Sequence, residues 1–223
     1  MSSAGDNPTG LDAYRPAEIA RRIEDAGVGK ASLALTQMTA LALLAGAFIA
    51  FGAAFYTLVM TGVDPGYGPS RLLGGAAFSL GLILVVVGGA ELFTGNALMV
   101  MAWVDRRVTT LALLRAWGIV YFGNFAGALA LALLVAGSGD QQRQGQQRMP
   151  RSSASSGELA VRIAETKMAL PPLEALLRGI LCNALVCLAV WLTFAAHDVA
   201  GKIFAILWPI TAFVALGFEH SVA

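Results

Sequence analysis

Long uncharged apolar runs alternate with short polar segments along the whole sequence. Asp, Glu, Lys and Arg are absent from five stretches: 31–63, 72–90, 116–139, 179–197 and 203–218. A helix needs about 20 apolar residues to cross a bilayer. The pattern therefore predicts five membrane-spanning helices, over 33–61, 72–90, 112–137, 176–195 and 203–218. A soluble bundle is disfavoured, because the first run alone has 33 residues without a charge.

The second apolar run is interrupted at "GGAELFTGNALMV", residues 88–100. Polar groups appear at Glu91, Thr94 and Asn96, and apolar residues then resume over 97–104. Eight residues cannot span a membrane, so they are predicted to be the second half of a broken helix. Such a break leaves N–H groups directed at a cavity, which favours an anion site. Alternatively, Thr94 only caps the resumed half-helix.

The end of the fifth apolar run repeats this pattern. Gly89-Ala90-Glu91 is followed by Thr94, and Gly217-Phe218-Glu219 is followed by His220. Transporters built from inverted repeats place broken helices at corresponding positions, with the site between them. The two halves would be helices 1–3 and helices 4–6. A three-plus-three repeat predicts a sixth helix, which is missing from this sequence.

The polar segments divide the chain into four parts. Residues 1–30 form an N-terminal segment with a short helix over 16–26, ended by Gly27 and packed on the cytoplasmic face. Residues 31–137 form the first repeat, 138–157 a polar low-complexity loop, and 158–223 an incomplete second repeat. Eight Lys and Arg residues on the N-terminal side against seven on the other favour a cytoplasmic N-terminus.

Composition narrows the function classes. The chain is 57% hydrophobic and 13% charged, whereas soluble domains carry about a quarter charged residues. The net charge of +1 gives no indication of nucleic-acid binding. Cys182 and Cys187 are five residues apart and do not share a helix face, so buried thiols are predicted rather than a disulfide or metal pair. No nucleophile–base set, metal-ligand cluster or phosphate loop indicates an enzyme or a cofactor.

The ionisable residues at the two breaks are the main candidates for chemistry. Glu91 and Glu219 are costly in a membrane and are expected to brace the breaks rather than contact a substrate. His220 lies in a polar break of an otherwise apolar segment and is expected to be functional. The second histidine, His197, lies beside Asp198 in a loop and is expected to be solvated.

Four segments together resemble the formate/nitrite transporter family. They are "GGAAFSLGLILVVVGGAELFTGN" (74–96), "WGIVYFGNFAGAL" (117–129), "RGILCNALVCLAVWL" (178–192) and "KIFAILWPITAFVALGFEHSVA" (202–223). The resemblance covers residues 16–136 and 158–223. It implies an aquaporin-like fold in the cell membrane and a homopentamer with one pore per protomer. It also implies passage of small monovalent anions such as formate, nitrite or hydrosulfide.

The resemblance also implies roles for individual residues. The break threonine of the family falls on Thr94 and its central histidine on His220. Its pore asparagine falls on Asn183, its vestibule lysine on Lys167 and its helix-5 glutamate on Glu219. The constriction-lining positions fall on Phe78, Leu82, Leu92, Phe93 and Phe213. Rings of Phe and Leu should block a bare anion and pass a neutral acid, with His220 assisting by protonation.

Two other functions remain open from the sequence. One is a neutral-solute facilitator of aquaporin type, although the first break carries Thr-Gly-Asn rather than Asn-Pro-Ala. The other is a non-transporting membrane fragment or scaffold, which the missing sixth helix suggests.

Overall fold

A computed structural model describes residues 13–138 and 155–220. The described residues form helices with short connections, and five of the helices are long and apolar enough to cross a membrane. The helices are α1 (Pro16–Ala31), α2 (Leu35–Met60), α3 (Gly68–Gly88), α4 (Phe93–Asn96), α5 (Met99–Val104), α6 (Thr110–Gly137), α8 (Ser156–Met168), α9 (Pro172–Ala195) and α10 (Val199–Leu216). The prediction of an all-helical, multi-pass membrane protein is confirmed.

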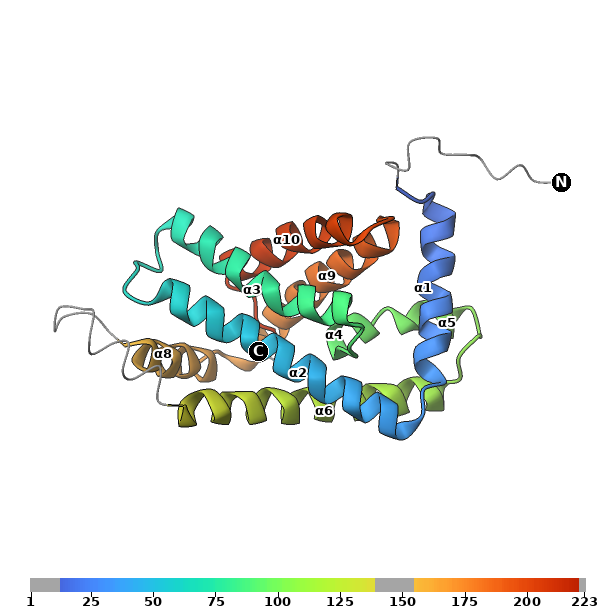
Figure 1. Cartoon of the computed structure of the whole chain (residues 1–223), viewed down its shortest axis with the longest axis horizontal. Coiled ribbons are helices and arrows are strands. Elements are labelled where there is room, and N and C mark those ends of the chain that lie inside the picture. The colour runs from blue at the N-terminus through green and yellow to red at the C-terminus, as the bar shows by residue number, and fades with distance from the viewer. Residues whose placement is uncertain (1–12, 139–154, 221–223) are drawn as a thin grey trace.

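The five long helices lie alongside one another, and the two amphipathic helices lie at opposite ends of the bundle (Figure 1). Helix α2 packs against α3 and α6, and α10 packs against α3 and α9. Helix α1 crosses one end of the bundle, beside α5, and α8 lies at the other end. We call these ends the α1 side and the α8 side. Most of the predicted polar loop 138–157 lies outside the described residues.

Helices α2 and α6 approach each other closely because glycines face the contact. The Gly123-x-x-x-Gly127 spacing is typical of closely packed helices, and the structure places both glycines against α2. A Cβ at Gly127 would overlap the backbone carbonyl of Leu43. The absence of side-chain bulk here brings Asn124, one turn earlier on α6, within reach of the α2 backbone.

Helix α1 is longer than the sequence predicted. Gly27 was expected to end it, but the helix continues to Ala31. Gly27 instead provides close packing, because a Cβ there would lie 3.1 Å from the Cβ of Ala102 on α5. A glycine that ends a helix usually takes the left-handed conformation. Gly27 does not have a positive φ, and its contacts with α5 support the following turn.

Contacts at both ends hold α1 against the bundle, and the cytoplasmic location predicted for this segment stays a prediction. Arg107 donates a hydrogen bond of 2.6 Å to Asp25, and this bond raises the pKa of the Arg107 guanidinium. Before the helix, the N–H of Tyr14 donates to the carbonyl of Ala195, 3.1 Å away. The Tyr14 ring also stacks on His197 at 3.9 Å between centroids. The α1 segment therefore contacts both the first repeat, through Arg107, and the loop between α9 and α10, through His197.

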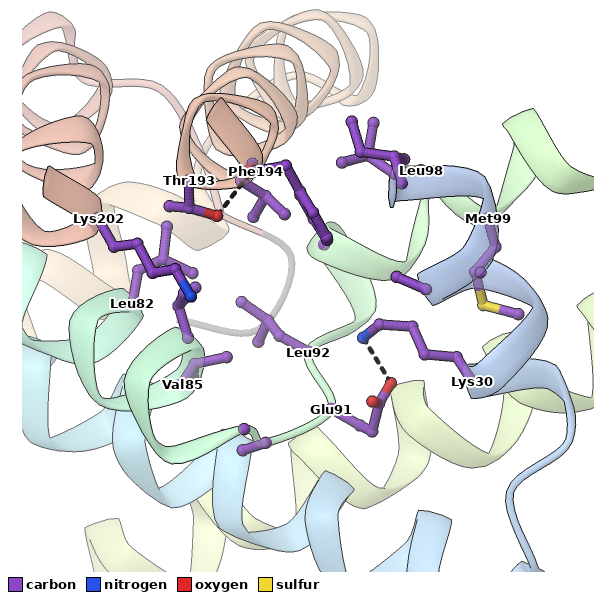
Figure 2. Close-up of a pocket in the computed structure, with 18 residues that line it drawn as sticks. Lys30, Leu82, Val85, Glu91, Leu92, Leu98, Met99, Thr193, Phe194 and Lys202 are labelled. Carbon is purple, nitrogen blue, oxygen red and sulfur yellow. Dashed lines mark hydrogen bonds and ion pairs between the residues drawn. The ribbon is translucent and has the colours of Figure 1, made fainter. Parts of the chain in front are cut away.

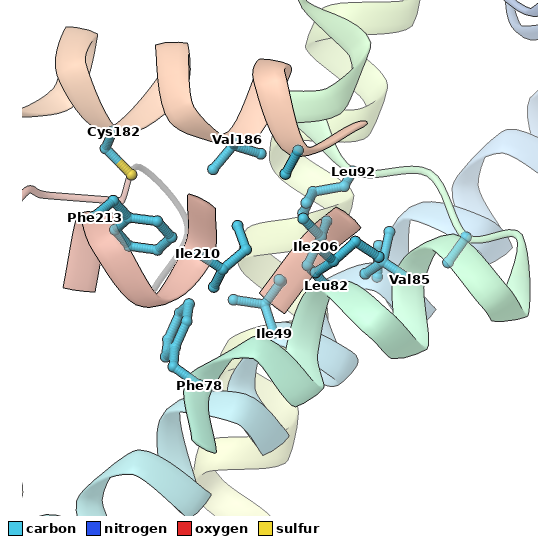
Figure 3. Packing of buried hydrophobic residues seen from close by; sticks show 13 residues of the cluster. Ile49, Phe78, Leu82, Val85, Leu92, Cys182, Val186, Ile206, Ile210 and Phe213 are labelled. Atoms are coloured by element: carbon cyan, nitrogen blue, oxygen red, sulfur yellow. The ribbon is translucent and has the colours of Figure 1, made fainter. Parts of the chain in front are cut away.

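Two clusters of buried apolar residues stabilise the bundle. The larger lies between α2, α3, α9 and α10 and includes Ile49, Leu82, Val186 and Ile210 (Figure 3). The smaller lies between α1, α2, α5 and α6 around Met38 and Met99. Both breaks lie beside the larger cluster, because Leu92 and Phe218 contact it.

Candidate functional site

The first break begins where α3 ends in a left-handed glycine. Gly89 has φ +72°, a conformation that glycine adopts without steric cost. The chain then extends to Leu92 before α4 begins at Phe93. The N–H of Ala90 returns to the carbonyl of Val85, and the N–H of Glu91 bonds to the carbonyl of Leu41 at 3.2 Å. The break is therefore built into the packing of α2.

Asn124 of α6 satisfies two backbone groups of this break, the carbonyl of Glu91 and the N–H of Phe93. Its Nδ2 donates to the carbonyls of Ala42 and Glu91, and its Oδ1 accepts from the N–H of Phe93, all at 2.8 Å. The residue is fully buried. Unsatisfied backbone groups are costly in a membrane, so one side chain stabilises both ends of the extended segment. Asn124 was not among the residues predicted from the sequence, although an amide inside an uncharged apolar run was an available signal.

The Glu91 carboxylate is held by a small network that also includes α1. It accepts from Lys30 Nζ and from Asn96 Nδ2, both at 2.9 Å. Lys30 also donates to Asn96 Oδ1 at 2.8 Å. The Glu91 side chain is 8% exposed and the Lys30 side chain 29%. The geometry agrees with the bracing role expected of Glu91. The pairing with Lys30 was not predicted.

The second break repeats the first in its geometry. Gly217 has φ +74°, and Phe218 N–H bonds to the carbonyl of Phe213 at 3.0 Å. Two residues after the glycine, Glu219 forms an ion pair of 3.1 Å with Lys167 of α8. In both breaks a lysine in the last turn of an amphipathic helix therefore pairs with the glutamate two residues after a left-handed glycine. This correspondence supports the predicted inverted repeat.

The breaks bring Thr94 and His220 together inside the bundle. Thr94 Oγ1 and His220 Nε2 are 3.5 Å apart, and both residues are buried. The His220 ring stacks on Phe213 with 6.0 Å between centroids, and Phe78 lies 6.4 Å away. Two residues 126 positions apart in the chain thus form one polar centre beside aromatic rings.

Four of the five predicted constriction residues flank this centre. Phe78 and Phe213 contact edge to face, 5.6 Å apart, while Leu82 lies one turn further along α3 toward the α1 side. Leu82 and Leu92 are both 2% exposed and meet in the same apolar cluster (Figure 3). Phe93 does not join them: its ring packs edge to face on Trp117 and Tyr121 of α6. A constriction role for Phe93 stays a prediction.

The remaining predicted pore residue, Asn183, is tied to the first break through a thiol. Cys187, one turn later on α9, donates toward Asn183 Oδ1 at 3.2 Å and toward the Thr94 carbonyl at 3.4 Å. Asn183, Thr94 and His220 are therefore linked through neighbouring contacts. Lys167 and Glu219 pair with each other where α8 approaches the second break.

A pocket of about 270 Å³ opens on the α1 side of Leu82 and Leu92 (Figure 2). Its walls are mostly apolar and come from α1, α3, α9, α10 and the first break. Two cations line it, Lys30 and Lys202. The pocket ends at the two leucines, with Thr94 and His220 outside its lining. A mostly apolar pocket that carries two lysines therefore lies on the α1 side of Leu82 and Leu92, and the polar centre of Thr94 and His220 lies outside its lining.

These features define a multi-pass helical membrane protein in which two broken helices of an inverted repeat meet within the bundle. A profile described as formate/nitrite transporter matches residues 17–223. The formate channel FocA of Escherichia coli K12 is 40% identical over 219 residues, which are 98% of this chain and 73% of FocA. The formate channel BtFdhC of Bacillus thuringiensis is 36% identical over 94% of this chain and 78% of its own.

Solved structures give the same result. A pentameric formate channel with formate bound matches with a TM-score of 0.68 and 37% identity, over 84% of this chain and 71% of that chain. An ion channel described as belonging to the FNT family matches with a TM-score of 0.79 and 26% identity, over 92% and 79%. The chain belongs to the formate/nitrite transporter family. Its relatives are channels and transporters rather than enzymes.

Proposed function

We propose that this protein is a channel for small monovalent anions, with formate as the first candidate and nitrite and hydrosulfide as others. The observation that carries the proposal is the meeting of Thr94 and His220 between apolar constrictions. The formate channels among the relatives support formate. The pentameric formate channel supports a homopentamer with one path through each protomer. We place the protein in the cell membrane with its α1 side facing the cytoplasm.

The proposed mechanism follows from the cost of charge in an apolar passage. A bare anion between Phe78 and Phe213, or between Leu82 and Leu92, loses its hydration without gaining partners. A neutral acid avoids most of this cost. An isolated imidazolium is also costly to bury, so an anion arriving beside His220 favours proton uptake by the pair. Transfer of that proton to the anion yields the neutral acid, which crosses the constriction.

Charged residues at both ends of the path would concentrate the anion. Lys30 and Lys202 line the pocket on the α1 side, and Lys167 pairs with Glu219 at the second break. Cations at a mouth with low-dielectric walls raise the local concentration of anions. On the first break, the Thr94 hydroxyl lies 3.5 Å from His220 Nε2.

The test is uptake of labelled formate and nitrite by proteoliposomes containing the protein, across a pH series. His220→Ala and His220→Phe should lower formate flux by about tenfold or more and flatten its pH dependence, since a general acid contributes about 10²–10⁴-fold where proton transfer limits the rate. The matched control is His197→Ala, which removes the only other histidine of the chain and should keep the pH profile.

Each contrary result has a distinct meaning. Unchanged pH-dependent flux in both His220 variants would refute proton donation and leave the channel intact. Passage of glycerol or water without formate would replace the anion channel by a neutral-solute facilitator. No flux of any solute by the wild-type protein would overturn the channel itself.

A further inference from the structure

Cys187 lies between two predicted pore residues, Thr94 on the first break and Asn183 on α9. Its sulfur lies 3.2 Å from Asn183 Oδ1 and 3.4 Å from the backbone oxygen of Thr94. Cys187 is half-buried and is not in a disulfide. The family resemblance assigned roles to Thr94 and Asn183 and none to Cys187.

The thiol has one hydrogen and two acceptors within reach. It can donate to the Asn183 amide or to the Thr94 carbonyl, and to both only as a shared bond. A carbonyl and an amide oxygen that share one donor are held close together. The Cys187 side chain therefore couples the position of the broken segment to the position of Asn183.

In the structure Oδ1 of the Asn183 amide faces the Cys187 thiol, and an S–H group that donates there favours this orientation of the amide. With Oδ1 facing the S–H group, the two Nδ2 hydrogens point away from Cys187. Among the residues that the structure describes, none accepts a hydrogen bond from them. An anion requires donors, so this orientation presents the favourable end of the amide. The flipped amide would direct an oxygen at the anion, which is repulsive.

The position of Cys187 on α9 places it along the same path. Spacings of four, three and four residues place four side chains on one face of α9: Asn183, Cys187, Val190 and Phe194. Val190 and Phe194 line the α1-side pocket. Cys187 thus lies between the pocket and Asn183, on the face of α9 that meets the first break.

We infer that Cys187 is a positioning residue: its thiol orients the Asn183 amide so that its donors meet the permeating anion, and ties that amide to Thr94. This inference rests on the proposed function, because it assigns Asn183 a role in binding the anion. It extends that function by naming the group that sets the direction of the amide.

The transport test compares Cys187→Ser, Cys187→Ala and Cys187→Val in proteoliposomes, with flux normalised to folded protein. Serine keeps a donor and should retain the half-saturating formate concentration of the wild type within about twofold. Alanine and valine lose the donor and should raise that concentration about three- to tenfold, as expected for one hydrogen bond, with little change in maximal flux. The matched control is Cys182→Ala, which also removes a thiol. Among the described residues Cys182 has no hydrogen-bond partner, so this variant should leave the half-saturating formate concentration unchanged.

A structural role would give a different result. Lower maximal flux at constant half-saturation in all three Cys187 variants, or equal values in Cys187→Ala and the wild type, would overturn the inference.

An infrared measurement separates this inference from the proposed function, because it needs no transport. The S–H stretching band of Cys187, identified by its loss in Cys187→Ala, should shift in Asn183→Ala, which removes the acceptor. A band that stays in place would show that the thiol does not bond the amide. If the band shifts but wild-type protein carries no formate, the geometric coupling stands and the assignment to anion binding fails together with the proposed function.

Discussion

Replacing Asn124 by leucine should destabilise the protein by about 2–5 kcal/mol, at nearly constant side-chain volume. The residue is fully buried and makes three hydrogen bonds of 2.8 Å, two to carbonyls and one from the N–H of Phe93. Each such bond contributes about 0.6–1.5 kcal/mol net, with the lower value typical of membrane proteins. Three bonds lost together give the predicted range.

The measurement is the free energy of unfolding in mixed detergent micelles, together with formate flux per folded protein. Asn124→Asp separates the two kinds of bond: it keeps an acceptor for Phe93 but loses both donated bonds and buries a charge. It should therefore be less stable than Asn124→Leu. The matched control is Gln37→Leu, which exchanges an exposed amide at the start of α2 and should change stability by less than about 0.5 kcal/mol.

The reasoning would be refuted by an Asn124→Leu protein as stable as the Gln37→Leu control. That result would mean that the extended segment of the first break does not depend on the α6 amide. Normal stability with reduced flux would instead assign Asn124 to permeation and remove its bracing role.

Three further variants test other parts of the structure. Lys30→Met should lower the free energy of unfolding by about 1–2 kcal/mol, less than for a fully buried ion pair because the lysine side chain is 29% exposed. The double variant Lys30→Met/Glu91→Leu should recover much of this loss, because it removes the carboxylate that the single variant leaves without its lysine. Equal losses in the single and the double variant would contradict this explanation. Gly127→Ala should lower the melting temperature strongly, since its Cβ would overlap the α2 backbone. The control Gly118→Ala places its Cβ in open space and should leave the melting temperature nearly unchanged. Similar melting temperatures for the two variants would disprove the close contact. Phe93→Ala should reduce stability by about 1–3 kcal/mol through lost packing on two aromatic rings of α6. The formate-to-acetate flux ratio of the same variant tests the predicted constriction role of Phe93: a raised share of acetate would support that role, and an unchanged ratio would refute it.

The membrane-spanning helices and both breaks could be predicted from the sequence by itself. A charge cannot stand on the lipid face of a helix without a large cost, so uncharged runs mark the spans. The polar residues at Glu91, Thr94 and His220 interrupt such runs, and their paired spacing after a glycine indicates a repeat. The resemblance to a family then assigned roles to Thr94, His220 and Asn183. The spans and the breaks depend only on neighbours along the chain, whereas the roles depend on the resemblance.

The tertiary structure decided which groups meet. Lys30 and Glu91 are 61 residues apart and Thr94 and His220 are 126 apart, and no local pattern specifies such pairings. Asn124 is one amide in an apolar helix, and only the close approach of α2 gives it three partners. Gly27 has the same sequence signal as a helix stop, yet packing against α5 keeps it helical. Hydropathy determines which segments enter the membrane, whereas the close packing of small residues and the satisfaction of buried polar groups determine how those segments meet.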